Sequence, residues 1–227
     1  MTTTLPTSTP VSGATTEPTG RGWAVAGAAA GVAGIVSIVG SSLSGAVYER
    51  ANWGDAPAIA ADMADLGPQI LLFHTATMLS CALLVVFATG LHRQLRRRTG
   101  ADSLIPGIAL GGLALVCVAQ LMGAGLTTEF LSFAAPSEAF VPEVVVFFGH
   151  WIGTIPWLWG GAGLTALAMA GASFRYGAYP RWIAWTSVVL GGLTALFMVS
   201  PLQDMAGMTG PLWLTVVATG LALTRRG

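Results

Sequence analysis

Three polar side chains interrupt long apolar stretches of the sequence and are its first candidates for chemistry. His74 lies five residues after Gln69, Gln120 lies five residues before Gly125, and His150 lies within a further apolar stretch. If each stretch is a helix that rises about 1.5 Å per residue, all three side chains lie roughly 8–10 Å from the same end of a bundle. A polar group inside a membrane is energetically costly and usually serves a function. We therefore predict a single polar layer that contains all three.

Acid–base chemistry is one use of such a layer. Glu143 and His150 are seven residues apart, which places them on one face of a helix, two turns apart. A carboxylate near an imidazole can serve as a general acid–base pair. Glu129 and Asp204 lie near the same end of the predicted bundle and are further candidate catalytic residues. The candidate substrate pocket consists of Trp151, Trp157, Trp159 and Gln120.

The same residues also have simpler interpretations. Tryptophan in a membrane protein commonly packs in the core or lies at the lipid interface. Pro142 predicts that Glu143 occupies the first turn of a helix, where the helix dipole favours a solvated, ionised carboxylate. The sequence leaves the catalytic and the structural interpretations open.

Metal or haem binding is a second possible use of the polar layer. His74, Met78 and Cys81 have the spacing i, i+4, i+7, so they share a helix face and together suit copper or another soft metal. His74 and His150 could instead ligate a haem from two helices. The alternative is a packing stripe with one hydrogen-bonded histidine. We expect Cys81 and Cys117 to be packing residues, because both lie in apolar stretches without a CxxC motif.

Several well-known catalytic signatures do not occur in the sequence. It contains no phosphate-binding GxxxxGK[ST], no HExxH and no GxSxG. The predicted membrane centre and its cytoplasmic third contain only weakly polar groups such as Ser and Thr. A proton or ion path across the whole membrane is therefore not supported, and no cofactor is identified.

The composition indicates which kind of scaffold carries these residues. Of the 227 residues, 54% are hydrophobic and 9% are charged, and the mean hydropathy is +0.71. A soluble domain has about 25% charged residues. The sequence therefore predicts an all-α integral membrane protein whose partners are membrane lipids and, for the enzyme hypothesis, a hydrophobic small molecule. With a formal net charge of zero, no nucleic-acid partner is expected.

Six apolar stretches are long enough, or nearly so, to cross a membrane as helices of about 20 residues. We expect Pro156 to kink or tilt the fourth helix, and Pro211 to lie at the start of the sixth. The residues before the first stretch, 1–20, form a predicted disordered tail, and 21–227 form the transmembrane domain. The predicted spans are Trp23–Val47, Gln69–Leu91, Leu104–Gly125, Val144–Phe174, Trp182–Ser200 and Met208–Thr224.

The arginines predict the orientation of the six spans. With six crossings, nine of the ten arginines fall on one side, and only Arg50 falls on the other, where eight acids lie. By the positive-inside rule, the arginine-rich side and both termini are cytoplasmic. The arginine run 93–98 (RQLRRR) could bind anionic lipid headgroups, or it could serve topology alone. Arginine without lysine, with abundant alanine and glycine, indicates a bacterial genome and hence a bacterial plasma membrane.

Two short features concern packing and the outer surface. The segment 57–67 has apolar residues near helical spacing and predicts a short helix on the outer surface. The pairs Gly27 and Gly31, and Gly107 and Gly111, are spaced by four residues and predict close helix contacts within the molecule.

The layout of the first half resembles a known group of proteins. An apolar span, then ERANWGDAPAIAADMADLG, then QILLFHTATMLSCALLVVF ending in HRQLRRR, resembles small bacterial multi-span membrane proteins of unknown function over roughly residues 25–125. The resemblance implies a bundle of six or seven helices and assigns no activity. Three functions stay open: a binding protein with an acidic outer face, a membrane-embedded enzyme acting on a lipid or isoprenoid, and a metal or haem protein.

Overall fold

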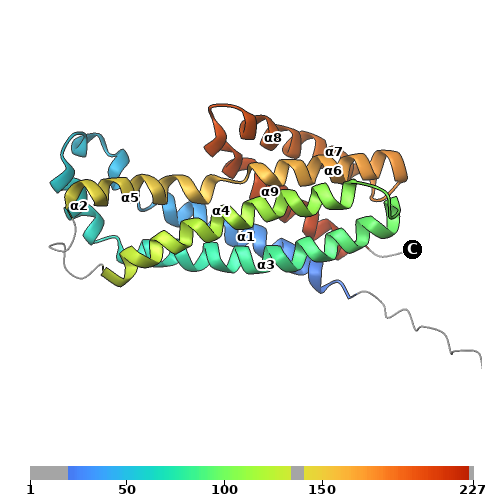
Figure 1. Ribbon diagram of the computed structural model, residues 1–227, viewed down its shortest axis with the longest axis horizontal. Coiled ribbons are helices and arrows are strands. Elements are labelled where there is room, and N and C mark those ends of the chain that lie inside the picture. Colours follow the sequence, from blue (N-terminus) through green and yellow to red (C-terminus); the bar gives the residue numbers. More distant parts are fainter. Residues whose placement is uncertain (1–19, 134–140, 225–227) are drawn as a thin grey trace, which may run out of the picture.

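The computed structural model describes residues 20–133 and 141–224, and all secondary structure assigned within them is helical (Figure 1). The predicted tail at residues 1–20 therefore lies outside the described residues except for Gly20. The α-helices are α1 (Gly22–Ser42), α2 (Ala56–Ala64), α3 (Gly67–Thr99), α4 (Ile105–Phe133), α5 (Pro142–Thr154), α6 (Gly160–Tyr176), α7 (Arg181–Thr186), α8 (Gly192–Val199) and α9 (Ala206–Leu223). The shorter elements are the 3-10 turns η1 (Ala46–Tyr48), η2 (Arg50–Asn52), η4 (Ile155–Trp157) and η6 (Gln203–Met205), and a π-helical turn, η5 (Ser187–Gly191), which joins α7 to α8.

Five helices of the described chain are long and apolar enough to cross a membrane, which bears out the prediction of an all-helical, multi-pass membrane protein. They have 19 to 33 residues, against a requirement of about 20 for a hydrocarbon layer of about 30 Å. The five are Gly22–Ser42, Gly67–Thr99, Ile105–Thr128, Arg181–Val199 and Gln203–Leu223.

The fourth predicted span is broken rather than kinked or tilted. Its two parts, α5 and α6, have 13 and 17 residues, so neither reaches the length of a full crossing. Pro156 has no N–H to continue the helix, and Leu158, with ψ 70°, leaves the helical conformation. Side chains satisfy the freed carbonyls: Ser41 donates to Ile152 at 2.7 Å, and the Trp159 indole donates to Pro156 at 3.1 Å.

The last helix starts earlier than predicted. Pro211 lies inside α9 and not at its start, because α9 begins at Ala206 directly after η6. Pro211 is only one turn from the start of the helix, so its missing N–H leaves a single first-turn carbonyl without its helical partner. Thr215 donates to the Pro211 carbonyl at 2.8 Å and remains in the helix.

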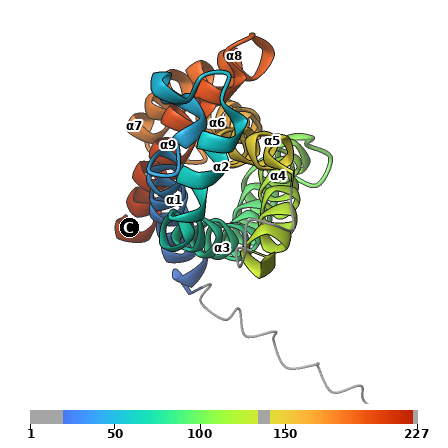
Figure 2. The same cartoon turned by 90° about the vertical axis from the view of Figure 1, so that its left-hand side faces the viewer.

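The long helices pack as a ring around one hydrophobic core. Each helix contacts the next in the order α9, α1, α3, α4, α6, α8, and α8 returns to α9 (Figure 2). Trp159 and Trp213 are the largest side chains that are fully buried in this core. The Trp213 indole donates to Ser187 at 3.0 Å, so its polar atom is satisfied in the π-helical turn.

A second, smaller core forms at the end of the bundle that carries α2, which we call the α2 end (Figure 1). The helix predicted at 57–67 is present as α2, which ends earlier, at Ala64, since Gly67 already begins α3. Asp55 caps α2 by accepting a hydrogen bond from the Ala58 N–H at 3.0 Å. Ile59 and Met63 of α2 are buried against the start of α5. The apolar side of α2 therefore packs on protein.

The opposite end carries every arginine of the described chain except Arg50, and we call it the arginine end. Arg21 donates to the Ala222 carbonyl at 3.3 Å and joins the start of α1 to the end of α9. Arg98 donates to the Ala178 carbonyl and joins the end of α3 to the α6–α7 link. On this side the two hydrogen bonds therefore join α1 to α9 and α3 to the α6–α7 link.

The predicted glycine contacts hold for one pair and fail for the other. A Cβ atom on Gly27 would meet Phe87, and one on Gly31 would meet the backbone of α9, so both allow close packing. Gly107 and Gly111 face open space, with no atom within 4 Å of a built Cβ. The α4 contact is made instead by Gly112, one residue away and on another face of the helix.

Candidate functional site

Gln120 links three helices in the core of the bundle. It is 3% exposed, and its Nε2 donates to Ser80 Oγ at 3.2 Å. Ser80 uses its only proton to donate to the Ala30 carbonyl at 3.0 Å, so it must accept from Gln120, which fixes the orientation of the amide. The remaining atom, Oε1, is buried and has no hydrogen-bond partner.

The predicted polar layer does not lie at one depth. Gln120 is level with Ser80, which is six residues, or about 9 Å, further along α3 than His74. The prediction placed the end of the helix at Gly125, whereas α4 continues to Phe133 and so carries Gln120 deeper. His74 is half-buried, and its Nδ1 is buried without a hydrogen-bond partner.

The candidate acid–base residues lie on the surface of the α2 end. Glu143 is exposed in the first turn of α5, and His150 is exposed two turns later. The ring of His150 meets that of Tyr48 of η1 edge-on, with 5.5 Å between the ring centroids. Asp204 is half-buried in η6, and the side chain of Glu129, in α4, lies outside the described residues.

The three tryptophans proposed for a substrate pocket have three different sets of neighbours. Trp159 is fully buried in the main core, and Trp157 packs against Gly207 of α9. The Trp151 indole donates to the Gly123 carbonyl of α4 at 3.3 Å. A shared pocket built from these side chains and Gln120 stays a prediction.

Cys81 contacts Cys117 on the neighbouring helix. Each thiol lies 3.8 Å from the backbone carbonyl of the other cysteine, and both cysteines are free and buried. In the described part of the chain, no group of three or more His, Cys, Asp or Glu side chains is arranged to hold a metal ion. The set of His74, Met78 and Cys81, in which a methionine would be one of the ligands, stays a prediction.

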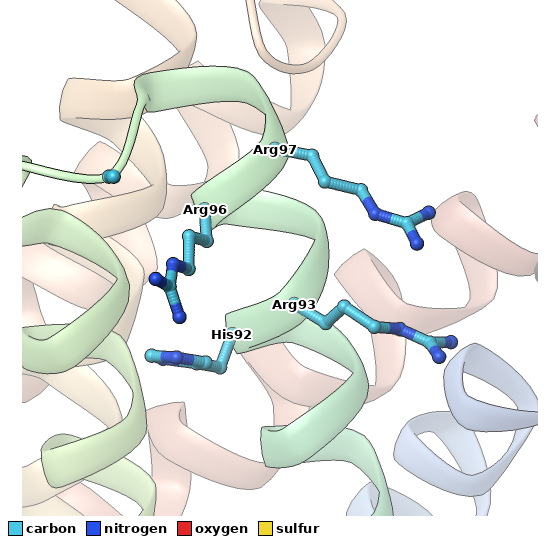
Figure 3. Close-up of a pocket in the computed structure, with 5 residues that line it drawn as sticks. His92, Arg93, Arg96 and Arg97 are labelled. Carbon is cyan, nitrogen blue, oxygen red and sulfur yellow. The ribbon is translucent and has the colours of Figure 1, made fainter. Parts of the chain in front are cut away.

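A hollow of about 340 Å³ opens at the arginine end, beside the last turns of α3. Figure 3 shows four of its lining side chains leaving the helix as two pairs, in which Arg96 lies over the ring of His92 while Arg93 and Arg97 extend together in another direction. Each pair has the spacing i, i+4, which brings its members onto the same helix face. Ala101, just after α3, completes the lining.

The three arginines in this hollow have no carboxylate partner among the residues that the structure describes. Arg93, Arg96 and Arg97 form no ion pair with a carboxylate within the described chain. Arg98 differs, because it donates to Ala178 and lies over the Tyr179 ring, 5.5 Å from its centroid. His92 Nδ1 lies 3.0 Å from the Pro106 carbonyl, so this nitrogen carries a proton and Nε2 is the ring atom left for another partner.

The arrangement suits an anion that bears a phosphate group. Arginine guanidinium groups match phosphate oxygens with two parallel hydrogen bonds each, which gives affinity and orientation together. The sequence contained the signal for this site in the spacing of HRQLRRR at residues 92–98. The prediction treated the run as a single basic segment and His92 beside it as an interfacial residue, because only the structure separates Arg98 from the other arginines.

Comparisons with known proteins found no match to the chain. No protein-family model matches the chain, no curated protein is similar to it, and no solved structure matches its fold.

Proposed function

We propose that the chain crosses a bacterial plasma membrane six times, with the arginine end in the cytoplasm. The broken pair α5 and α6 supplies the sixth crossing, since α5 begins at the α2 end and α6 ends beside Ala178 at the arginine end (Figure 1). An even number of crossings is consistent with α1 starting and α9 ending at the same end. The positive-inside rule then supports a cytoplasmic location for that end.

We propose that the function of this membrane protein is to bind a phosphate-bearing anion in the hollow beside α3. The observation that carries the proposal is the set of three arginines that line one hollow without a carboxylate partner. Topology alone needs positive charge on the cytoplasmic side, but it does not need a shared hollow. The ligand would supply the carboxylate-like negative charge with which these arginines form no ion pair in the described part of the chain.

Binding of inorganic phosphate to the detergent-purified full chain tests this proposal. We expect the thermal unfolding temperature to rise with the logarithm of the phosphate concentration above Kd, whereas chloride at the same ionic strength has no such effect. The triple variant Arg93→Lys, Arg96→Lys, Arg97→Lys keeps the positive charge that sets topology but loses the planar guanidinium groups that bind phosphate with two hydrogen bonds each. The matched control is Arg175→Lys with Arg181→Lys, which lie at the same end outside the hollow. Equal phosphate response in all three proteins would exclude the site.

A second candidate function concerns the α2 end, which would face outward. Asn52 donates to Asp62 at 2.7 Å, so η2 and α2 are fixed together, while Glu49, Asp65 and Glu143 remain exposed around them. This supports a binding surface for a cationic ligand or partner. The enzyme alternative, which acts on a lipid or isoprenoid through Glu143 and His150, is tested by Glu143→Gln in a turnover assay. The metal or haem alternative is tested by metal analysis and the absorption spectrum of the purified protein.

A further inference from the structure

We propose that the natural ligand of the hollow is a phospholipid with two phosphate groups, one held by Arg96 with His92 and the other by Arg93 with Arg97. The inference rests on the proposed function and names the ligand class for the same site. It follows from the two directions in which the side chains point and from the apolar surface beside them.

The two pairs form two subsites rather than one. In Figure 3 the side chain of Arg96 points toward His92, whereas those of Arg93 and Arg97 both extend in another direction, away from His92. A phosphodiester has only two non-bridging oxygens, and the donors of one pair are enough to occupy both. The second pair then has an unmatched charge unless the ligand carries another phosphate.

The surface beside the hollow suits acyl chains. Leu104 is 79% exposed at the start of α4, and Ile108, one turn further into the apolar region, is 48% exposed. On α3, Val85 and Val86 are also exposed, about two turns before His92. An amphipathic ligand can place its phosphates in the hollow and its chains along these side chains. Free phosphate or pyrophosphate has no part that contacts them.

The sign of the charge on such a ligand suits the site, and its two negative charges leave one of the three arginine cations unneutralised. Three arginines line the hollow, and a phospholipid with two phosphodiester groups brings two negative charges that remain ionised at neutral pH. Basic pockets on the cytoplasmic side of transmembrane helices are suited to headgroups of this kind. Because the hollow lies at the end of α3, the phosphates would sit at headgroup depth while the chains stay in the inner leaflet.

The test uses the full chain in nanodiscs and in detergent, with binding measured by native mass spectrometry and by thermal stabilisation. The probes are diphosphatidylglycerol, which has two phosphates, phosphatidylglycerol at twice the molar amount, and inorganic pyrophosphate. We expect diphosphatidylglycerol to bind at least about tenfold more tightly than phosphatidylglycerol, because its two phosphates occupy both subsites at once. Arg96→Lys and the double variant Arg93→Lys, Arg97→Lys should each reduce that preference to about threefold or less. Arg175→Lys with Arg181→Lys should leave it unchanged.

The outcomes separate this inference from the proposed function. Equal affinity for the one-phosphate and two-phosphate lipids, with both lost in the triple lysine variant, would overturn the two-subsite inference and leave phosphate binding intact. If pyrophosphate binds as tightly as diphosphatidylglycerol, the inference that the ligand is a lipid is overturned. Lipid binding that is indifferent to all the arginine variants would overturn both proposals.

Discussion

Gly112 of α4 and Gly161 of α6 pack backbone to backbone. A Cβ atom on either residue would come well within 3.0 Å of the carbonyl oxygen of the other. Close by, Thr165 of α6 donates to the Ala109 carbonyl of α4 at 2.9 Å. This contact sets the separation of α4 and α6, because neither backbone can retreat without losing that hydrogen bond.

Gly112→Ala should therefore destabilise the protein. Overpacking of a tight contact costs about 1–3 kcal/mol, and here the obstacle is backbone rather than a flexible side chain. Gly111→Ala is the matched control, since position 111 faces open space, and we expect a gain of about 0.5–1 kcal/mol from the reduced freedom of the unfolded chain. Equilibrium unfolding in mixed micelles measures both. Equal stability of the two variants would contradict the contact.

Arg98 should matter for stability and not for phosphate binding. It satisfies the carbonyl of Ala178, which is 1% exposed, so Arg98→Ala leaves a buried acceptor without a partner at a cost of about 1–3 kcal/mol. The control is Arg181→Ala at the same end, an exposed change expected to stay within about 0.5 kcal/mol. Thermal unfolding with and without phosphate tests both expectations. A lower unfolding temperature with an unchanged phosphate response is the expected result for Arg98→Ala.

Tyr179 predicts a loss of stability at alkaline pH. Burial raises the pKa of its phenol above the usual value, and the nearby Arg98 cation opposes this only in part. Because the folded state holds the proton more tightly than the unfolded state, this contribution is complete below about pH 10 and is lost as the pH rises above it. Unfolding measured from pH 8 to pH 11 should show a smaller decline for Tyr179→Phe than for the wild type.

The same variant tests the environment of the phenol at neutral pH. The Tyr179 hydroxyl is buried without a hydrogen-bond partner, so Tyr179→Phe should be as stable as the wild type or more stable at pH 7. Tyr176→Phe is the control, since Tyr176 is 42% exposed, and it should keep the alkaline decline of the wild type. A clear loss of stability in Tyr179→Phe at pH 7 would show that the hydroxyl has a partner.

The proposed orientation is tested by labelling single cysteines in a Cys81→Ser, Cys117→Ser background. Asp55→Cys lies at the α2 end and Tyr176→Cys at the arginine end, and both positions are exposed. A membrane-impermeant maleimide should label position 55 in intact cells and position 176 only after permeabilisation. The reverse pattern would invert the orientation, and labelling of both positions in intact cells would exclude an odd number of crossings between them.

Hydropathy was sufficient to predict α1, α3 and α4, because long apolar stretches in this composition have few alternatives to membrane helices. It was not sufficient for the fourth span, since a proline can either kink a helix or end it. Which of these happens at Pro156 depends on Ser41 and Trp159, whose side chains satisfy the freed carbonyls. Those contacts come from tertiary packing, which the local sequence does not encode.

The candidate sites show the same limit. The depth of Gln120 was wrong because it was counted from an assumed helix end at Gly125, and the apolar pattern gives no sharp signal where α4 continues beyond it. The arginine run was visible as a charge cluster. Its division into Arg98, which is bound to the α6–α7 link, and three unpaired arginines depends on where that link lies.

We expect the break between α5 and α6 to let the protein adapt to bilayers of different thickness. An unbroken helix that is too long for the hydrocarbon layer must tilt as a whole and move its neighbours with it. Here α5, about 20 Å long, packs on α2, whereas α6, about 26 Å long, packs on α4 and α8. The non-helical residues Leu158 and Trp159 allow the two pieces to take different inclinations. A change in membrane thickness can then be absorbed at the α2 end while the spacing of the arginine end is preserved.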